Sequence, residues 1–458
     1  MTRNTLFIIL DDLNSWIGAL GSQPDVKTPH IDALARRGVL FSRAYCSAPY
    51  CNASRMGLFT GLYPDSNGIY GNNDFWERAD RPTLLMEQLR EAGVYTIGAG
   101  KVLHGAFDYI DACRTKSLSA AWRELFNRDE IWDEFQSLEP DPLPHRRPLN
   151  GFFDLSKFDE IPKQYHGFDW GALPDEAESL MPDTHSVDYL IQFLLNSLRE
   201  PFFCAAGLYK PHLPWHAPQW CFDLYDPEKL SLPLVKEDDL EDVPDIPKAW
   251  VAQRPDHETI LRHKQWRAAV HGYLACISYA DHQVGRLTAA LSQSGLADTT
   301  EIILCSDNGF HLGEKLHWRK FVLWEEATRV PVIVASPDGP NGLVVDEPIS
   351  LIDLHPTMLE AAGVKNSDHT DGVSLRPLIA GSASSRRTPP RTTWLKGNNS
   401  IRRGTWRYTR YSDGTEELYD HRTDPHEWTN LADCPTQRTN LDAFRASMDE
   451  QSYEKDRE

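Results

Sequence analysis

Acidic and amide side chains follow two apolar runs of this chain at the point where each run ends. Asp11 and Asp12 come directly after the run 5–10, and Asp307 and Asn308 follow a second such run. Continuous apolar runs are typical of parallel strands buried on both faces. Because α/β folds bind ligands at the carboxyl ends of their strands, we expect these four side chains to meet at one sheet edge. Such an all-oxygen set suits a hard divalent ion, Ca²⁺ first, with Mg²⁺ or Mn²⁺ as alternatives.

Basic side chains are predicted to reach the same edge. A lysine and a histidine come shortly after each of two further strands, which we expect at residues 94–97 and 202–207. Lysine and arginine bind the oxygens of a tetrahedral oxyanion, and histidines can move protons. The cations and histidines of this set are Arg55, Lys101, His104, Lys210 and His212.

Cys51 is the candidate nucleophile. It begins a predicted helical segment that Gly61 and Pro64 end. A helix N-terminus favours negative charge, because its first N–H groups have no partner within the helix. On this segment alone, a buried structural cysteine is an equally good interpretation. The basic and acidic groups predicted around it favour a reactive residue that attacks beside a metal ion.

Strands and helices alternate over most of the chain, which predicts an α/β fold with a large mixed, mostly parallel sheet between helices. Further strands are expected at 301–306 and 330–335. From about residue 385 the pattern changes to a hairpin signal around 412–414, followed by an amphipathic helix from about 438. We therefore predict a catalytic domain over 1–380 and a small C-terminal subdomain of antiparallel sheet plus helix over 385–458. Further helices are expected at 29–37, from about 83 to Gly93, and at 184–198, 264–294 and 353–362.

Composition excludes several classes of function. The net charge of −20 argues against a nucleic-acid partner, and no apolar run is long enough to span a membrane. An anionic substrate therefore needs a locally basic pocket. The eight cysteines form no CxxC pair, so neither a zinc site nor a redox motif is indicated. Met1 lies close to the first apolar run, which predicts a cytoplasmic protein, or a periplasmic one if an export signal was removed.

Taken together, these blocks resemble the sulfatase family of the alkaline-phosphatase superfamily over nearly the whole chain. Cys51-x-Ala53-Ser54-Arg55 is similar to the family's modification signature, and Asp11-Asp12 to its N-terminal metal pair. The Lys-Pro-His block and a Leu-Gly-Glu segment most resemble the iduronate-2-sulfatase branch. The other matching blocks are Gly100-Lys101-x-x-His104, Lys210-Pro211-His212, Ser306-Asp307-Asn308-Gly309, Lys320 and Glu417-Leu418-Tyr419-Asp420.

The resemblance implies a nucleophile that the genetic code does not supply. In this family a separate enzyme, a formylglycine-generating enzyme or a radical maturase, oxidises the signature cysteine to Cα-formylglycine. The hydrate of that aldehyde then attacks the sulfur of a small anionic sulfated substrate. Ala53 stands where the signature usually has proline, so the extent of conversion at Cys51 is expected to depend on the host.

The resemblance also assigns a role to each site residue. A hydroxyl of the hydrate, deprotonated with help from Asp307, attacks the sulfur in line. Arg55 and Lys101 would orient the hydrate, while His212 and Lys320 bind the sulfate and protonate the departing alcohol oxygen. His104 would remove a proton from the second hydroxyl and so expel sulfate. The residues implied as Ca²⁺ ligands, together with the formylglycine made from Cys51, are Asp11, Asp12, Asp307 and Asn308.

Two other functions compete with sulfate ester hydrolysis. Phosphonate monoester and phosphodiester hydrolases of the same superfamily share this nucleophile, and a degenerate fold could serve as a binding protein. The region 106–180 is expected to cross the active face, and the substrate's alcohol part depends on it. Among further histidines, His355 is predicted to be structural, whereas His216, His311 and His317 could line the substrate pocket or lie on the surface.

Overall fold

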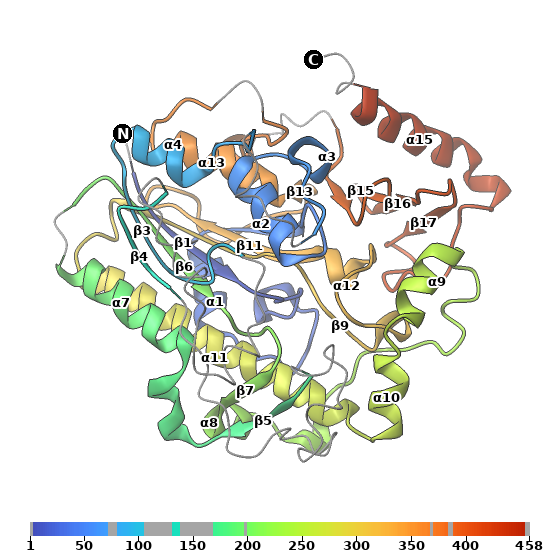
Figure 1. The fold of residues 1–458 in the computed structure, drawn as a ribbon, viewed down its shortest axis with the longest axis horizontal. Coiled ribbons are helices and arrows are strands. Elements are labelled where there is room, and N and C mark those ends of the chain that lie inside the picture. The colour runs from blue at the N-terminus through green and yellow to red at the C-terminus, as the bar shows by residue number, and fades with distance from the viewer. Residues whose placement is uncertain are drawn as a thin grey trace.

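A nine-stranded sheet lies at the centre of the molecule (Figure 1). The computed structural model describes residues 3–71, 80–104, 131–137, 168–196, 199–366, 370–382 and 388–453. The strand order is β12-β2-β11-β8-β1-β6-β3-β4, with β13 also paired to β2. All of its strand pairs are parallel except the two that β11 makes, which confirms the predicted mixed, mostly parallel sheet. The strands are β1 (Asn4–Leu10), β2 (Val39–Tyr45), β3 (Tyr95–Gly100), β4 (Glu134–Gln136), β6 (Phe202–Leu208), β8 (Thr300–Ser306), β11 (Arg329–Ala335), β12 (Leu343–Val345) and β13 (Ile349–Ser350).

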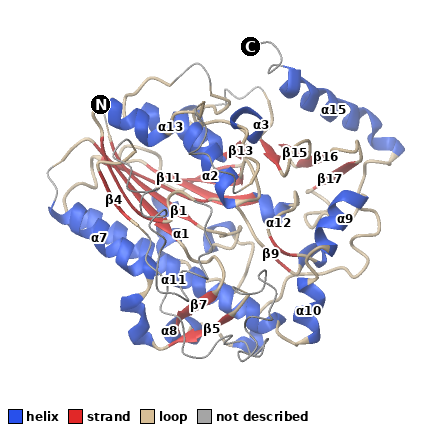
Figure 2. Ribbon diagram, viewed as in Figure 1, coloured by secondary structure: helices blue, strands red, loops and turns tan. Residues whose placement is uncertain are grey.

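Helices cover both faces of this sheet because its central strands are apolar on both faces. Every residue of β1 is buried, and successive side chains of a strand point to opposite faces. Leu6 and Ile8 belong to the core under α1, α7 and α11, whereas Phe7 belongs to the core under α2, α4 and α13. Figure 2 shows these two helical layers. The helices are α1 (Pro29–Arg37), α2 (Cys51–Thr60), α4 (Leu85–Glu91), α7 (Pro182–Asn196), α11 (Trp266–Gln293) and α13 (Leu354–Ala361).

Shorter strands and helices complete the described part of residues 1–380. β5 (Trp170–Leu173) pairs in parallel with β7 (Trp215–Pro218), and β9 (His311–Leu312) pairs antiparallel with β10 (Trp318–Arg319). The short helices are α3 (Pro64–Asn67), α8 (Gln219–Asp223), α9 (Asp245–Ala252), α10 (Asp256–Arg262), α12 (Glu325–Thr328) and α14 (Arg376–Ile379).

The third strand was predicted over 94–97, and the predicted end at residue 97 was wrong. β3 continues through Gly98 to Gly100. A Cβ on Gly98 would lie 2.8 Å from the ring of Phe135, and one on Gly100 would lie 2.2 Å from the carbonyl oxygen of Gly207. The glycines therefore allow close packing along the strand rather than ending it. Most of the predicted excursion over 106–180 lies outside the described residues.

The C-terminal part forms a four-stranded antiparallel sheet with one helix, as predicted. The turn at 412–414 joins β16 to β17, and the sheet packs Tyr408 and Leu418 against Phe444 of the helix. The division of the chain at 380–385 stays a prediction. The elements are β14 (Arg391–Thr393), β15 (Asn399–Arg403), β16 (Trp406–Arg410), β17 (Glu416–Asp420) and α15 (Arg438–Tyr453).

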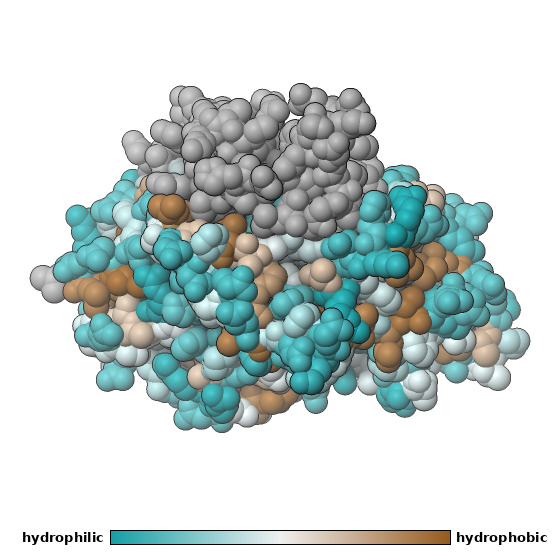
Figure 3. Space-filling view, turned by 90° about the horizontal axis from the view of Figure 1, so that it is seen from below, coloured by the Kyte–Doolittle hydropathy of each residue, from teal (hydrophilic) through white to brown (hydrophobic). Residues whose placement is uncertain are grey.

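The surface is that of a charge-rich chain. The face shown in Figure 3 is mostly hydrophilic where it is coloured, with apolar areas scattered across it. None of the described helices combines the length and the hydropathy that a bilayer crossing requires.

A buried ion-pair network ties the C-terminal sheet to the loop after β8. Arg407 of β16 pairs with Glu325 of α12, and its Nε lies 2.5 Å from Glu427 Oε1. The same side chain donates to the carbonyl oxygen of Leu323 at 2.9 Å. Because all three charged groups are almost fully buried, each depends on the others for compensation.

Removing the arginine from this network should destabilise the protein strongly. Arg407→Met removes the cation that two buried carboxylates share and leaves only Arg402 near Glu325 and His421 near Glu427, which costs about 3–5 kcal/mol. The unfolding temperature of Arg407→Met should fall by several degrees relative to wild type. The control is Arg422→Gln, because Arg422 pairs with Asp420 while 64% of its side chain is exposed; this variant should unfold close to wild type. Equal unfolding temperatures for both variants would contradict the prediction.

Candidate active site

Adjacent parallel strands bring the acidic residues together. β1 and β8 pair in register, with Leu10 opposite Ser306, so the residues that follow them emerge side by side. The amide N–H groups of Asp12 and Asn308 donate to Asp307 Oδ1 at 3.1 and 2.8 Å. Asp12 has a left-handed φ of 63°, which turns the chain sharply after β1. The strand-end cluster expected from the sequence is therefore formed, and its acidic side chains are buried.

Cys51 lies directly beside this cluster. α2 begins at Cys51 and ends at Thr60, and the next residue, Gly61, has a left-handed φ of 71° that closes the helix. The cysteine Sγ lies 2.7 Å from Lys320 Nζ and 3.8 Å from Asp12 Oδ1. Within the described chain, one ligand atom each from Asp11, Asp12, Cys51 and Asp307 lies within 4.8 Å of the others.

These residues fit a divalent cation. Burial, with the neighbouring carboxylates of Asp11 and Asp12, raises the pKa of Asp307 to about 7 although Arg55 opposes the shift. Asn308 Oδ1 is buried and has no hydrogen-bond partner among the described residues. Crowded carboxylates and an unpaired carbonyl oxygen are stabilised by a hard cation, which supplies charge and ligand bonds at once.

Three fixed cations surround the carboxylates. Arg55 Nε donates to Asp307 Oδ2 at 2.9 Å, and Arg55 Nη2 lies 3.5 Å from Asp11 Oδ1. Lys101 pairs with Asp11, and Lys320 pairs with Asp12. Burial alone would raise the pKa of Asp11, but the Lys101 ammonium and its neighbours hold it well below its usual range. The surrounding cations therefore keep Asp11 ionised even though it is fully buried.

Both predicted histidines lie at the edge of this cluster in their neutral form. His212 Nε2 is 3.6 Å from Asp12 Oδ2, and burial lowers the pKa of His212 to about 4. Burial, together with the Lys101 cation, lowers the pKa of His104 well below its usual value. Neither ring nitrogen of His104 has a hydrogen-bond partner among the described residues. A neutral imidazole in this position can accept a proton.

Two residues that the sequence did not single out hold the Lys-Pro-His segment. The ring of Tyr209 lies 4.9 Å from Lys101 Nζ and 4.8 Å from the ring of His212. Asp183, in the first turn of α7, accepts hydrogen bonds from the N–H groups of Tyr209 and Lys210 at 2.7 and 2.9 Å. Lys210 Nζ itself donates to the carbonyl oxygen of Pro214 at 2.7 Å. The only sequence signal for Asp183 was an acidic residue near the start of a helix.

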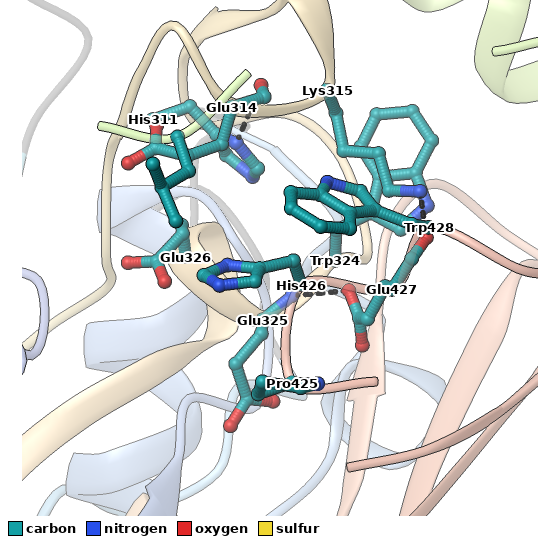
Figure 4. Close-up of a pocket in the computed structure, with 11 residues that line it drawn as sticks. His311, Glu314, Lys315, Trp324, Glu325, Glu326, Pro425, His426, Glu427 and Trp428 are labelled. Carbon is teal, nitrogen blue, oxygen red and sulfur yellow. Dashed lines mark hydrogen bonds between the residues drawn. The ribbon is translucent and has the colours of Figure 1, made fainter. Parts of the chain in front are cut away.

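The remaining histidines have separate surroundings. His355 is buried and contacts Gln88, consistent with the structural role predicted for it. His216 lies 2.9 Å from Asp169. His317 Nε2 lies 2.8 Å from the carbonyl oxygen of Lys320 and so supports its backbone. His311, His426 and several acidic residues line a cavity of about 20 Å³ (Figure 4). This cavity has room for about one water molecule.

Comparison with known proteins gives consistent matches. Residues 3–364 match the family described as Sulfatase, and residues 313–454 match N-sulphoglucosamine sulphohydrolase, C-terminal. A protein of Formosa agariphila called Sulfatase is 33% identical over 461 residues, covering 97% of this chain and 86% of its own. Iduronate 2-sulfatase of Homo sapiens is 30% identical over 408 residues, covering 85% of this chain and 70% of its own.

The fold also resembles a solved structure with a different activity in its name. Phosphonate monoester hydrolase of Agrobacterium radiobacter superposes with a TM-score of 0.77 at 20% identity, covering 99% of this chain and 96% of that one. At this identity the likeness concerns the fold alone.

Replacing an acidic residue of the cluster should weaken cation binding. Asp307→Asn keeps an oxygen ligand but removes one charge, so its affinity for Ca²⁺ should fall by at least about 10–100-fold. Calorimetric titration of chelator-treated protein measures the affinity. Asp239→Asn is the matched control, because Asp239 is a buried acid that pairs with Lys315 outside the cluster. Equal Ca²⁺ affinity in the two variants would exclude this cluster as the metal site.

Proposed function

Because the chain belongs to the sulfatase family and is a sulfuric ester hydrolase, we propose that it cleaves a sulfate ester with a nucleophile made from Cys51. One observation carries this proposal. Cys51 Sγ lies at the start of α2, 2.7 Å from the Lys320 ammonium and within 4.8 Å of ligand atoms of three acidic side chains. A residue in that position would be close to a metal ion, to a cation that binds the substrate, and to a field that favours an anion.

The proposal includes a divalent cation and a modified residue. Ca²⁺ would be held by Asp11, Asp12, Asp307, Asn308 and residue 51, where it would polarise the sulfate and favour an ionised nucleophile. Conversion of Cys51 to formylglycine would supply an aldehyde hydrate, whose second hydroxyl gives the covalent intermediate a route to release sulfate. Burial and the neighbouring Asp11 raise the pKa of the unmodified Cys51 thiol well above its usual value, so the thiol itself is a poor nucleophile.

The surrounding residues would position the reactants and move protons. Arg55 is fixed by Asp307 and by the carbonyl oxygen of Val102 at 2.9 Å, so it can hold its charge beside residue 51. Lys320 contacts both Asp12 and Cys51, where it can bind a sulfate oxygen. We propose that His212, next to Asp12, and Lys320 assist the departing alcohol oxygen, and that His104 accepts a proton from the hydrate.

The substrate is proposed to be a sulfated carbohydrate, with a uronate sulfate as one candidate. Support comes from the human relative, whose name gives iduronate as its substrate. We propose that a formylglycine-generating enzyme or a radical maturase modifies Cys51, in the cytoplasm. Because Ala53 stands where the signature usually has proline, we propose that the fraction of Cys51 that is converted depends on the maturation enzyme of the host.

Modification of Cys51 can be tested directly. Mass spectrometry of the peptide that contains residue 51 should show a species of lower mass, with an aldehyde in place of the thiol. Cys51→Ala should lose turnover completely while its unfolding temperature stays close to wild type, because the side chain is small and the helix start is kept. Only thiol in protein from the native host, or wild-type rates from Cys51→Ala, would overturn the nucleophile assignment.

The class of ester can be tested with a substrate panel. We expect a higher kcat/KM for para-nitrophenyl sulfate than for an aryl phosphonate monoester or an aryl phosphodiester, with Cys51→Ala as the blank for each. The reverse order of kcat/KM would favour the phosphonate and phosphodiester hydrolases that share this fold. No turnover of any ester by protein that carries the modified residue would favour a binding function.

A further inference from the structure

Arg254 is a partly buried cation that forms no ion pair with an acidic side chain among the described residues. It lies between α9 and α10, and its guanidinium carbon is 3.7 Å from the centre of the Phe321 ring. Its Nη1 is buried and has no hydrogen-bond partner within the described chain. A buried donor that lacks an acceptor costs free energy, and more so when it is charged.

The local charge balance leaves this arginine in excess. The carboxylate of Asp256 already pairs with Arg319, whose Nε lies 2.7 Å from Asp256 Oδ2. Burial lowers the pKa of the neighbouring His317 to about 3, so this histidine is neutral, and burial also lowers the pKa of His257. Burial, reinforced by the Arg319 cation, lowers the pKa of Arg254 to about 10, so it remains charged at neutral pH. An added anion would therefore meet an uncompensated positive charge.

The ring of Phe321 connects Arg254 to the proposed catalytic residues, because Arg254 stacks on this ring and Phe321 directly follows Lys320. The N–H of Phe321 donates to the carbonyl oxygen of Pro49 at 3.3 Å. Its ring is 5.2 Å from that of Tyr50, the residue before Cys51. Burial raises the pKa of the Tyr50 hydroxyl, and the Lys320 and Arg254 cations both oppose that shift.

Phe321 and Tyr50 form an aromatic triad with Trp394. The three ring centres are separated by 5.2, 5.6 and 5.6 Å, and each side chain is partly exposed. Trp394 follows β14, so the C-terminal part of the chain contributes to this triad. Partly exposed aromatic faces beside a cation are suited to a ligand that has both an apolar face and a charge.

We propose that Arg254 and the aromatic triad form a subsite for a second anionic group, a carboxylate or a second sulfate, on the alcohol part of the substrate. This inference rests on the proposed function and specifies its substrate class. The planar guanidinium is only partly buried, and its fork of N–H groups can bind either anion. The triad would contact the sugar ring that joins the two anionic groups.

Three sulfated sugars that differ only at the exocyclic carbon would test the subsite. One carries a hydroxymethyl group there, one a carboxylate, and one a second sulfate ester. Wild-type enzyme should show a kcat/KM about 10–100-fold higher for a doubly anionic sugar than for the hydroxymethyl sugar. A comparison of kcat/KM for the sugar with a carboxylate and the sugar with a second sulfate identifies which anion the subsite prefers. Arg254→Gln should remove the preference chiefly through KM, because the contact is remote from the reacting bond.

Binding and control variants keep the result independent of turnover. In the Cys51→Ala background, calorimetry should show the same preference in Kd and its loss on adding Arg254→Gln. Arg254→Lys should restore part of it, since the charge remains without the fork. Arg262→Gln, which changes an exposed arginine of α10, should leave the preference intact. Para-nitrophenyl sulfate, which has no second anion, should be hydrolysed equally by wild type and Arg254→Gln.

The outcomes separate this inference from the proposed function. An Arg254→Gln enzyme that keeps the preference, or that loses activity equally on every ester, would overturn the subsite. So would a wild-type enzyme that hydrolyses para-nitrophenyl sulfate but shows no preference among the three sugars. Failure of the modified wild-type enzyme to hydrolyse any sulfate ester would instead overturn the proposed function.

Discussion

The rest of the site depends on one constraint, the burial of three carboxylates at the ends of two neighbouring strands. Asp11, Asp12 and Asp307 lie with Cys51 in a space where their ligand atoms are within 4.8 Å of one another. Like charges so close in a medium of low dielectric repel each other strongly. Three buried cations oppose that repulsion, and a divalent ion fits the remaining unpaired oxygen. The same charges that make the acidic cluster tolerable are the ones that could bind a sulfate.

Because these carboxylates are buried, the cations beside them must be held in fixed positions, and residues far apart in the chain contribute to this. The segment that carries Lys320 contains left-handed conformations at Lys315, Leu316, Arg319 and Phe321, none of which is glycine. Such conformations persist only where the surroundings impose them. Here those surroundings include the contact of His317 with the Lys320 backbone, and the contacts of Arg407 with Leu323 and with Glu325 of α12. The C-terminal sheet thereby helps to hold a residue of the site.

The groups around the sulfate and those that would choose the alcohol come from different parts of the fold. The ends of β1 and β8 supply the acidic cluster, and its cations come from α2, from the end of β3 and from the segment after β10. Arg254 lies between two short helices, and Trp394 follows the first strand of the C-terminal sheet. A site of this kind can change its alcohol specificity without disturbing the carboxylates, because loops and short helices tolerate substitution better than buried strands do.

The sequence by itself determined the family and the fold class, and it predicted those site residues that lie directly after a buried apolar strand or at a helix start. Asp11 after β1, Asp307 after β8 and Cys51 at the start of α2 are local features that the pattern alone shows. Only the tertiary structure decided which groups hold those residues. Asp183 supports the Lys-Pro-His segment from a different helix, and β3 runs on through Gly100 because β6 packs against it. The candidate role of Arg254 could be inferred only from the structure, in which Arg254 stacks on Phe321 and Asp256 pairs with Arg319. Neither contact follows from spacing along the chain.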